Sequence, residues 1–374
     1  MHASGGFTVG ELQVKSDTIF YKALSGERLQ MDEAVHIYRA APLEELMLLA
    51  MEMRQRMVPG NSVGWIVDRN VNITNVCFSQ CSFCNFCRKK SDADAYVTTL
   101  GEYREKIAGL FALGGDQLLL QGGMNPALGL PYYEELFSTL KGEFPLLKLH
   151  ALGPPEVAYL AAKESLPVRT VLERLHAAGL DSLPGAGAEI LSDRVRKIVS
   201  PAKATTAEWL GVMREAHKMN LPTSATMMFG HAETDEERVE HLMLLRGLQD
   251  ERPEGHWGFI TFVPWPFQDE GTRLAAKQGI RNSVDAAAYI RMVALCRIVL
   301  DNITNIQSSL LTVGADTAMV TLHAGANDLG SIMIEENVVS AAGAGHRYDA
   351  EGIQDVIRRA GFIPRRRDQR YLPV

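Results

Sequence analysis

Short apolar runs alternate along the chain with longer stretches in which apolar residues recur every three or four positions. The short runs predict strands, and the longer stretches predict amphipathic helices. Strands are expected over residues 63–67 continuing to 71–74, and over Gln117–Gln121, Leu147–Leu152, Thr223–Phe229, Phe259–Phe262 and Ile306–Leu310. Helices are expected over Gly101–Leu113, Tyr132–Glu143, Val168–Ala178, Thr206–Met219, Asp235–Leu248 and Val284–Leu300.

This alternation of strands and helices predicts βαβ units and a parallel sheet. Six or more units without a clear linker favour a TIM-type (β/α) barrel, full or nearly full, over an open sheet. We expect an N-terminal helical extension over residues 1–60, with two helices meeting at Pro42. The barrel should span residues 61–340, and a C-terminal helical tail should pack on it over 341–374. The basic run 365–367 is interpreted as a solvated tail, and residues 1–30 have no predicted role.

Composition narrows the class of protein. The chain has 374 residues and a formal net charge of -7, which argues against a nucleic acid or an anionic membrane as partner. The sequence contains no run of the roughly twenty apolar residues that a membrane span needs. Five cysteines in a chain without a recognisable signal peptide are typical of a reduced compartment. We therefore expect a cytoplasmic protein that binds neither nucleic acid nor membranes.

Four cysteines lie within eleven residues, and the first three, Cys77, Cys81 and Cys84, are spaced C-x3-C-x2-C with Phe83 before the third. Three thiolates at this spacing suit a [4Fe–4S] cluster whose fourth iron is left open for a small molecule. A zinc site usually pairs two C-x2-C units, or one unit with two histidines. The remaining cysteine, Cys296, lies far away in an apolar helical stretch.

Cys87 leaves a second interpretation open. Together with Cys81 and Cys84 it forms C-x2-C-x2-C, part of a ferredoxin-type run that would use all four clustered cysteines and leave no open iron. An electron carrier rarely needs a core of this size. We interpret Cys87 as a neighbour of the cluster site rather than a ligand.

Several further candidates follow predicted strands, where a barrel carries its chemistry. They are Gln121-Gly122-Gly123, His150, and Gly230 with His231 and Glu233. Glu189 follows a glycine-containing turn before a predicted helix over Ile190–Val199. Structural explanations also exist: a tight turn, hydrogen-bonded core histidines, and a capping box formed by Thr234 and Glu237. Met227 and Met228 are expected in the core.

Seven segments are similar to a known family. They are Asn72-Ile-Thr-Asn-Val-Cys77, Leu119-Leu-Gln-Gly-Gly123, Tyr132-Tyr-Glu-Glu-Leu-Phe137, Ala178-Gly-Leu-Asp-Ser-Leu-Pro184, Ala188-Glu-Ile190, Met227-Met-Phe-Gly-His231, and Gly325-Ala-Asn-Asp-Leu-Gly330 with Glu335-Glu336. Together they resemble the radical S-adenosylmethionine (SAM) enzymes that act on futalosine-type substrates and in deazaflavin synthesis. The resemblance covers nearly the whole chain from about residue 30.

Within this branch, Phe262-Val-Pro-Trp-Pro-Phe-Gln268 and Ile334-Glu-Glu-Asn-Val-Val-Ser340 are most similar to the dehypoxanthine futalosine cyclases. The chain also departs from the branch at four positions. Met124 stands where the glycine motif of radical SAM barrels has an acid, and Ala186 replaces a glycine. Asn85 and Cys87 stand where an alanine and an aromatic residue are common.

The resemblance implies a [4Fe–4S] cluster on Cys77, Cys81 and Cys84, with SAM on the open iron. It implies contacts to SAM from Phe83, Gln121, Gly122, Gly123, Glu189 and Gly230, and a wall for the substrate ring at Trp265. One electron, from a donor such as flavodoxin or ferredoxin, would release a 5′-deoxyadenosyl radical from SAM. That radical would take hydrogen from C4′ of the substrate ribose, and the carbon radical would close a ring onto the benzoate. His150, Glu233 and His231 are candidates for the base.

Three alternatives remain open at this point. An aminofutalosine synthase would retain the adenosyl group in its product. The tyrosine-using subunit of deazaflavin synthase would act on tyrosine. A non-catalytic iron–sulfur electron carrier would need Cys87 as a ligand and would not respond to SAM.

Overall fold

A computed structural model describes residues 9–332, 334–335, 341, 343 and 345–374. Within these residues, parallel strand pairings form a closed ring. The pairings join β2 (Asp68–Asn72) to β3 (Gln117–Gln121) and β3 to β4 (Lys148–Ala151). Single bridges, from His150 to Ser182 and from Leu183 to Thr223, lead on to β5 (Thr223–Phe229).

The second half of the ring returns to the first strand. Strand β5 pairs with β6 (Phe259–Pro266), and β6 with β7 (Asn305–Ile306). A bridge from Gln307 to Asp328 reaches β8 (Asp328–Ser331), which pairs with β1 (Ser62–Ile66). Because β1 continues into β2 after Val67 alone, the ring closes, and the predicted TIM-type barrel is confirmed.

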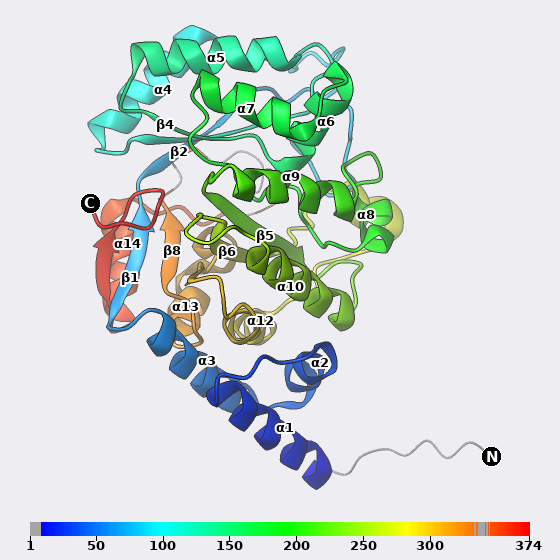
Figure 1. The fold of residues 1–374 in the computed structure, drawn as a ribbon, viewed down its shortest axis with the longest axis vertical. Helices are drawn as coiled ribbons and strands as arrows, with labels where there is room; N and C mark the ends of the chain where they lie inside the picture. Colours follow the sequence, from blue (N-terminus) through cyan, green and yellow to red (C-terminus); the bar gives the residue numbers. More distant parts are fainter. Residues whose placement is uncertain (1–8, 333, 336–340, 342, 344) are drawn as a thin grey trace, which may run out of the picture.

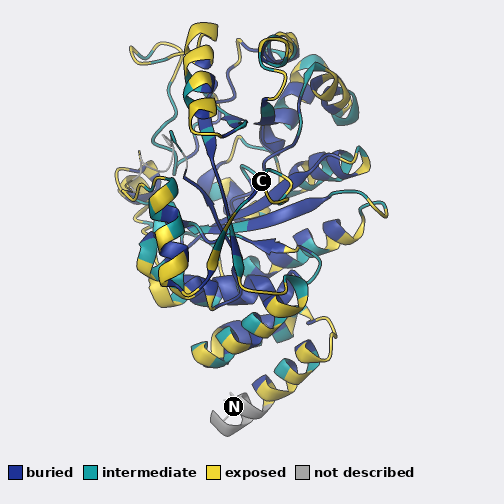
Figure 2. Cartoon of the chain, turned by 90° about the vertical axis from the view of Figure 1, so that its left-hand side faces the viewer, coloured by how far each residue is buried: buried dark blue, intermediate teal, exposed yellow. Residues whose placement is uncertain are grey.

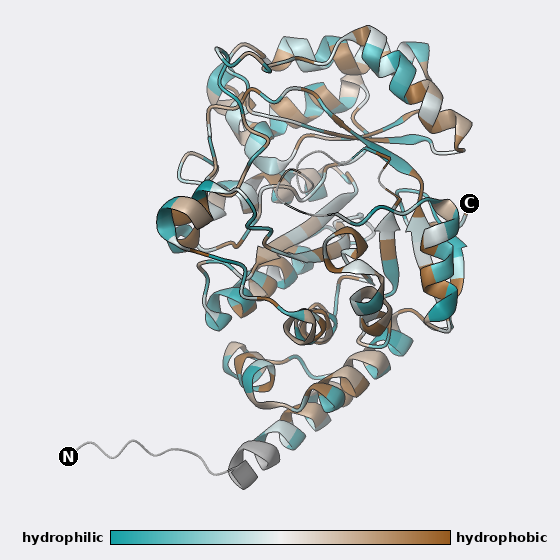
Figure 3. Ribbon diagram, turned by 180° about the vertical axis from the view of Figure 1, so that it is seen from behind, coloured by the Kyte–Doolittle hydropathy of each residue, from teal (hydrophilic) through white to brown (hydrophobic). Residues whose placement is uncertain are grey.

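Helices surround this ring (Figure 1). They are α4 (Leu100–Ala112), α5 (Leu130–Glu143), α6 (Pro154–Glu164), α7 (Val168–Ala178), α8 (Asp193–Val199), α9 (Thr206–Lys218), α10 (Asp235–Asp250), α11 (Arg273–Gln278), α12 (Ala286–Val299), α13 (Leu310–Leu322) and α14 (Ala350–Arg359). Figure 2 shows the strands buried and the outer helix faces exposed. Figure 3 shows the same helices with alternating hydrophobic and hydrophilic stripes.

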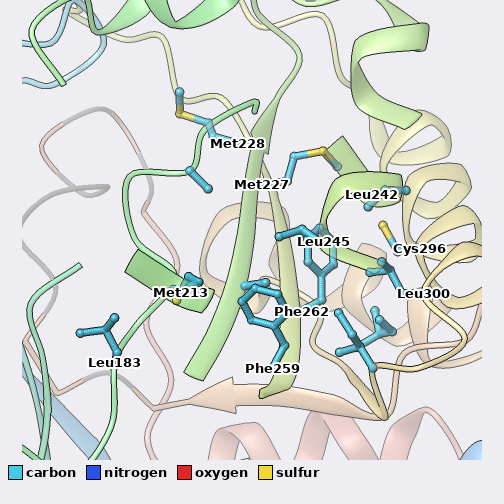
Figure 4. Close-up of a cluster of buried hydrophobic side chains, with 14 of the residues drawn as sticks. Leu183, Met213, Met227, Met228, Leu242, Leu245, Phe259, Phe262, Cys296 and Leu300 are labelled. Carbon is cyan, nitrogen blue, oxygen red and sulfur yellow. The ribbon is translucent and has the colours of Figure 1, made fainter. Parts of the chain in front are cut away.

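Strand β5 is buried along its whole length, because a parallel barrel strand contacts the barrel interior on one face and helices on the other. Met227 points to Leu242 and Cys296 of the helical layer, while Met228 points to the opposite side (Figure 4). Both methionines are buried, as predicted, and Cys296 is buried within α12.

Three helices precede the barrel: α1 (Val9–Leu24), α2 (Met31–Ala40) and α3 (Leu43–Met57). The break between α2 and α3 falls at Pro42, as the sequence predicts. Helix α2 packs against α10, and α3 packs against α12, so this part of the chain lies on the outer helical layer. None of the helices in the described part of the chain is both long and apolar enough to cross a membrane.

Two expectations about local structure are wrong. The expected strand Ile306–Leu310 ends at Ile306, because helix α13 already begins at Leu310. The helix expected from Ile190 begins only at Asp193, so Glu189 lies in the preceding turn with a φ of 47°.

The C-terminal segment differs from its prediction as well. It contains the expected helix, α14, but then adds β9 (Ile363–Arg366), which pairs with β1. The basic run is not a solvated tail throughout. Arg367 is 6% exposed, and its Nε lies 2.5 Å from Oδ2 of Asp328. Sequence patterning missed this pairing because the two residues lie on different elements with no local signal that links them.

Candidate functional site

The clustered cysteines lie on the loop between β2 and α4, at the carboxyl end of the first barrel strand, where the sequence places them. A parallel bridge between Val76 and Arg88 closes this loop, and the amide of Cys77 donates to the carbonyl of Arg88 at 3.0 Å. The amide of Ser82 donates to the carbonyl of Val199 at 2.8 Å. The loop is therefore anchored both to itself and to the end of α8.

The donor set suits an iron–sulfur cluster. Cys81 is buried, Cys77 and Cys84 are half-buried, and the Oγ of Ser79 lies 3.2 Å from the sulfur of Cys81. The backbone amides of Ser79 and Met124 lie against the sulfur of Cys77. The backbone amides of Phe86 and Cys87 lie against the sulfur of Cys84. Hydrogen bonds to thiolate ligands are among the features that set the reduction potential of such clusters.

Cys87 lies directly on the first ligand of the motif. The single S–H of Cys87 is shared between the carbonyl oxygen of Cys77, 3.4 Å from the Cys87 sulfur, and the sulfur of Cys77. The hydrogen bond from Cys87 lowers the pKa of Cys77 to about 5 and raises the pKa of Cys87 itself. Among the described residues, no three His, Cys, Asp or Glu side chains converge as they would on a single metal ion. The assignment of three cysteines to the cluster therefore rests on their spacing and on the family.

The glycine pair after β3 packs tightly against the cysteine loop. A Cβ on Gly123 would lie 2.2 Å from the carbonyl oxygen of Val76 and 2.8 Å from Cβ of Cys77. A Cβ on Gly122 would lie 3.1 Å from the backbone of Thr74. Only glycine permits this approach. The pair thus has a structural role, and its predicted contact with SAM stays a prediction.

An ion pair that sequence reasoning missed lies beside the cysteines. The Nζ of Lys203 is 2.9 Å from Oε1 of Glu189 and 5.2 Å from the ring centroid of Phe83. Burial alone would lower the pKa of Lys203, but the charges of Cys81 and Glu189 more than offset this effect and raise it. Lys203 lies in the loop between α8 and α9, where no motif marks it.

Gly230 and Glu233 form a closed turn after β5. The side chain of Glu233 accepts hydrogen bonds from the amides of Gly230 and His231, and it pairs with Arg238 at 2.8 Å. Burial would raise the pKa of Glu233, but His231, Arg238 and the amides lower it overall. The predicted capping box of Thr234 and Glu237 is confirmed at the start of α10.

The two histidines singled out at strand ends are engaged by neighbours. The Nδ1 of His150 lies 2.7 Å from Oγ of Ser182 and 3.1 Å from Nε2 of Gln369, and burial lowers its pKa to about 3. The Nε2 of His231 lies 3.0 Å from the carbonyl oxygen of Met228. A histidine with so low a pKa is a weak proton acceptor at neutral pH. The identity of the base stays a prediction.

Trp265 lies near the carboxyl end of β6, in register with Met228 of β5, and is half-buried. Of the predicted set, the cysteines, Phe83, the glycine pair and Glu189 come together around one loop. The glycines pack against the cysteine loop. Glu189 and Phe83 are brought together by Lys203, which contacts both. The turn at Gly230 and the ring of Trp265 belong to β5 and β6.

Two family models match the chain. The model of the radical SAM superfamily matches residues 71–245, and the model described as the CofH/MqnC C-terminal region matches residues 256–374. The first match contains the cysteine loop and Glu233. The second contains Trp265 and the C-terminal segment that reaches the barrel interior.

Curated relatives align over almost the full length. The chain is 41% identical to cyclic dehypoxanthine futalosine synthase of Streptomyces coelicolor, over 94% of this chain and 87% of the relative. It is 39% identical to the protein of the same name from Halalkalibacterium halodurans, over 95% and 94%. It is 36% identical to 5-amino-6-(D-ribitylamino)uracil–L-tyrosine 4-hydroxyphenyl transferase of Methanopyrus kandleri, over 94% and 98%.

Solved structures agree with the fold. Methylornithine synthase superposes with a TM-score of 0.68 at 20% identity, covering 92% of this chain and 97% of that structure. The FeFe-hydrogenase maturase HydG from Carboxydothermus hydrogenoformans superposes with a TM-score of 0.70 at 14% identity, covering 97% and 83%. The chain belongs to the radical SAM superfamily, in the family that includes the cyclic dehypoxanthine futalosine synthases and the 4-hydroxyphenyl transferases.

Proposed function

We propose that this chain is an enzyme that cyclises dehypoxanthine futalosine to cyclic dehypoxanthine futalosine, in the futalosine route to menaquinone. The proposal rests on two relatives of that name, to which the chain is 41% and 39% identical over nearly its full length. The segment around Trp265 is most similar to the same enzymes. A small-molecule substrate is consistent with chemistry at a barrel mouth.

The radical SAM superfamily uses a [4Fe–4S] cluster and SAM, and Cys77, Cys81 and Cys84 would hold the cluster. The bound pair supplies one-electron chemistry that removes a hydrogen atom from the substrate. Cys87 would contact the cluster through the Cys77 thiolate without being a ligand. A one-electron donor such as flavodoxin or ferredoxin would reduce the cluster.

The ion pair beside the cysteines fits a ligand with both hydroxyls and a carboxylate. The carboxylate of Glu189 can accept hydrogen bonds from ribose hydroxyls, and the ammonium of Lys203 can pair with a carboxylate. Phe83, under Lys203, offers an apolar face at the same place. Gly230 contributes backbone at the turn after β5, where an adenine could lie. Glu189 and Lys203 would thus bind the ribose hydroxyls and the carboxylate of SAM.

The substrate must be held so that C4′ of its ribose faces both SAM and its own aromatic ring. Trp265, half-buried at the end of β6, offers a flat apolar surface for that ring. Orientation of this kind contributes about 7–11 kcal/mol in favourable cases. The reaction also requires that water is kept away from the reactive carbon centre.

A second candidate function is supported by a specific observation. The chain is 36% identical to the tyrosine 4-hydroxyphenyl transferase of Methanopyrus kandleri over nearly its whole length. Reconstituted protein should be offered, in parallel, dehypoxanthine futalosine, the enolpyruvyl benzoate of aminofutalosine synthesis, and tyrosine with the ribitylamino uracil. Turnover of the first alone supports the proposal, whereas turnover of tyrosine would replace it with the transferase function.

A further inference from the structure

Glu156 is a buried acid that the proposed function does not yet use. It occupies the first turn of α6, directly after β4, and 9% of it is exposed. Oε2 of its carboxylate accepts a hydrogen bond from the amide of Gly153 at 2.7 Å. Oε1 is buried and has no hydrogen-bond partner among the described residues. A buried polar atom left in this state costs roughly 1–3 kcal/mol, more if charged, so a missing partner is expected.

The surroundings of Glu156 place it at the cluster site. A Cβ on Gly187 would lie 2.5 Å from Cγ of Pro155 and 3.6 Å from Nζ of Lys203, so the start of α6 packs against the turn that carries Glu189. The amide of Gly122 lies near the Glu156 carboxylate and favours its charged form, but it does not meet hydrogen-bond geometry at Oε1. Burial, followed by the charge of Cys77, raises the pKa of Glu156 to about 8.

Comparison with two other capping acids sets Glu156 apart. Glu102 and Glu208 occupy the same helical position on α4 and α9, where each accepts from a threonine amide and hydroxyl. Both are exposed. Glu156 caps a glycine instead, is enclosed, and keeps one oxygen free. Capping therefore explains one of its two oxygens but leaves Oε1 without a function.

The glycine turn nearby lacks an acid of its own. Met124 occupies the position after the glycine pair, its amide lies against the sulfur of Cys77, and its carbonyl accepts from Phe78 at 3.1 Å. An amino group bound at the open iron would thus find backbone but no carboxylate on this turn. The carboxylate of Glu156 is the acid that faces Gly122 from the neighbouring helix.

We infer that Oε1 of Glu156 accepts a hydrogen bond from the amino group of SAM, taking the place of the acid that the glycine turn lacks. This inference rests on the proposed use of SAM but not on the identity of the second substrate. Glu156 is a binding residue, and the ammonium of bound SAM would hold its carboxyl in the charged form although burial raises its pKa. Loss of such a bond weakens binding by about tenfold to a hundredfold.

The test compares SAM with its analogue that lacks the amino group, in wild type and Glu156→Gln, using anaerobically reconstituted protein. Glutamine keeps the capping bond to Gly153, because its carbonyl can also accept from the helix start. Glu102→Gln makes the same change on α4, where the acid is exposed, and is the matched control. Dissociation constants come from equilibrium dialysis, and iron content and thermal midpoint are measured alongside.

We expect Glu156→Gln to weaken SAM binding about tenfold or more and to leave binding of the analogue unchanged, so that the preference for SAM falls by the same factor. Glu102→Gln should behave as wild type. Equal weakening for both ligands, or none for either, would overturn the inference. If Glu156→Gln loses iron, Glu156→Asp replaces it, since the shorter side chain withdraws the carboxylate. A wild-type preference for SAM in that variant would equally overturn the inference.

Failure here can be told apart from failure of the proposed function. If wild type binds SAM and cyclises its substrate while Glu156→Gln retains the full preference, only the role of Glu156 is lost. If wild type with an intact cluster binds no SAM, the proposed function itself fails, and the inference fails with it.

Discussion

The ammonium of Lys203 lies 2.9 Å from the carboxylate of Glu189, and this pair joins the loop after α8 to the turn before it. Both side chains are largely buried beside the cysteine loop, with the ring of Phe83 below the ammonium. The sequence analysis identified Glu189 of this pair as a candidate site residue, but it did not identify Lys203. Several predictions about the site and the barrel depend on buried pairs of this kind.

Removal of one partner of that pair should destabilise the protein more than removal of both. Lys203→Met leaves the Glu189 carboxylate buried and unpaired, at a cost of about 3–5 kcal/mol. The double variant with Glu189→Gln has neither charge and should recover most of this loss. Arg174→Met, which breaks an exposed pair with Glu134, should cost under about 1 kcal/mol. Denaturant unfolding of the four proteins measures these differences, and equal midpoints for the two Lys203 variants would contradict the account.

Two arginines of the C-terminal basic run, Arg365 and Arg367, should contribute very differently to the free energy of unfolding. Arg367→Met leaves Asp328 buried without its partner, and we expect a loss of about 3–5 kcal/mol in the free energy of unfolding. Arg365→Met changes an exposed residue of the same run and should fall within about 0.5 kcal/mol of wild type. Thermal or denaturant unfolding distinguishes the two. Similar stabilities for both variants would mean that Arg367 is not held inside the barrel.

Iron content should distinguish the three proposed cluster ligands from Cys87, which is proposed to be only a neighbour of the cluster. Cys77→Ser, Cys81→Ser and Cys84→Ser should each lose most of the iron after anaerobic reconstitution, because these three thiolates hold the cluster in the proposed function. Cys87→Ser should retain iron near the wild-type content, since the hydroxyl can still donate to Cys77. Iron and sulfide analysis with electron paramagnetic resonance provides the measurement. Loss of iron in Cys87→Ser as severe as in Cys84→Ser would favour the electron-carrier alternative.

Buried histidines should make the fold sensitive to acid. Burial lowers the pKa of His241 from its ordinary value of 6.5 to about 3, and its Nδ1 accepts from the amide of Leu191. Between these two values the unfolded chain binds a proton that the folded chain does not. Stability is therefore unaffected above about pH 6.5 and falls below it, by about 1.4 kcal/mol per pH unit for each such group.

His241→Asn keeps an acceptor for the amide of Leu191 but cannot titrate in this range. The variant should show a smaller fall in unfolding free energy between pH 6.5 and pH 4.5 than wild type does. Denaturant unfolding at a series of pH values provides both slopes. Identical slopes would show that His241 is not held neutral in the folded protein.

Much of the fold follows from local patterns. Strands such as Gln117–Gln121 and Thr223–Phe229 match their predicted ranges, because their apolar runs are bounded by helical stretches. Helix α6 was missed because Pro154 and Pro155 at its start read as helix breakers, although proline suits a first helical turn. Strand β8 and the short bridge at Ser182 were missed because they contain few apolar residues.

The residues of the site can also be divided into those that belong to a local motif and those that do not. The cysteine spacing and the glycine pair are local motifs, and the sequence alone finds them. Lys203 contacts Phe83 from a distant loop, and Glu156 lies in the first turn of α6, so neither residue belongs to a local motif. Five residues of the tail that resembles the cyclases, 336–340, lie outside the described residues. The role of the first residues, 1–8, lies outside them too.

In the proposed function, the adenosyl radical released from SAM would remove hydrogen from C4′ of dehypoxanthine futalosine, and the resulting substrate radical would close a ring onto the benzoate. The direct measurement uses substrate deuterated at C4′, with reconstituted protein, SAM and dithionite, followed by mass spectrometry. The account predicts 5′-deoxyadenosine that carries the deuterium, in equal amount to a product lighter than the substrate by one hydrogen and one deuterium. Unlabelled deoxyadenosine without that product would contradict the cyclase function, and no cleavage of SAM by protein with an intact cluster would contradict the radical chemistry itself.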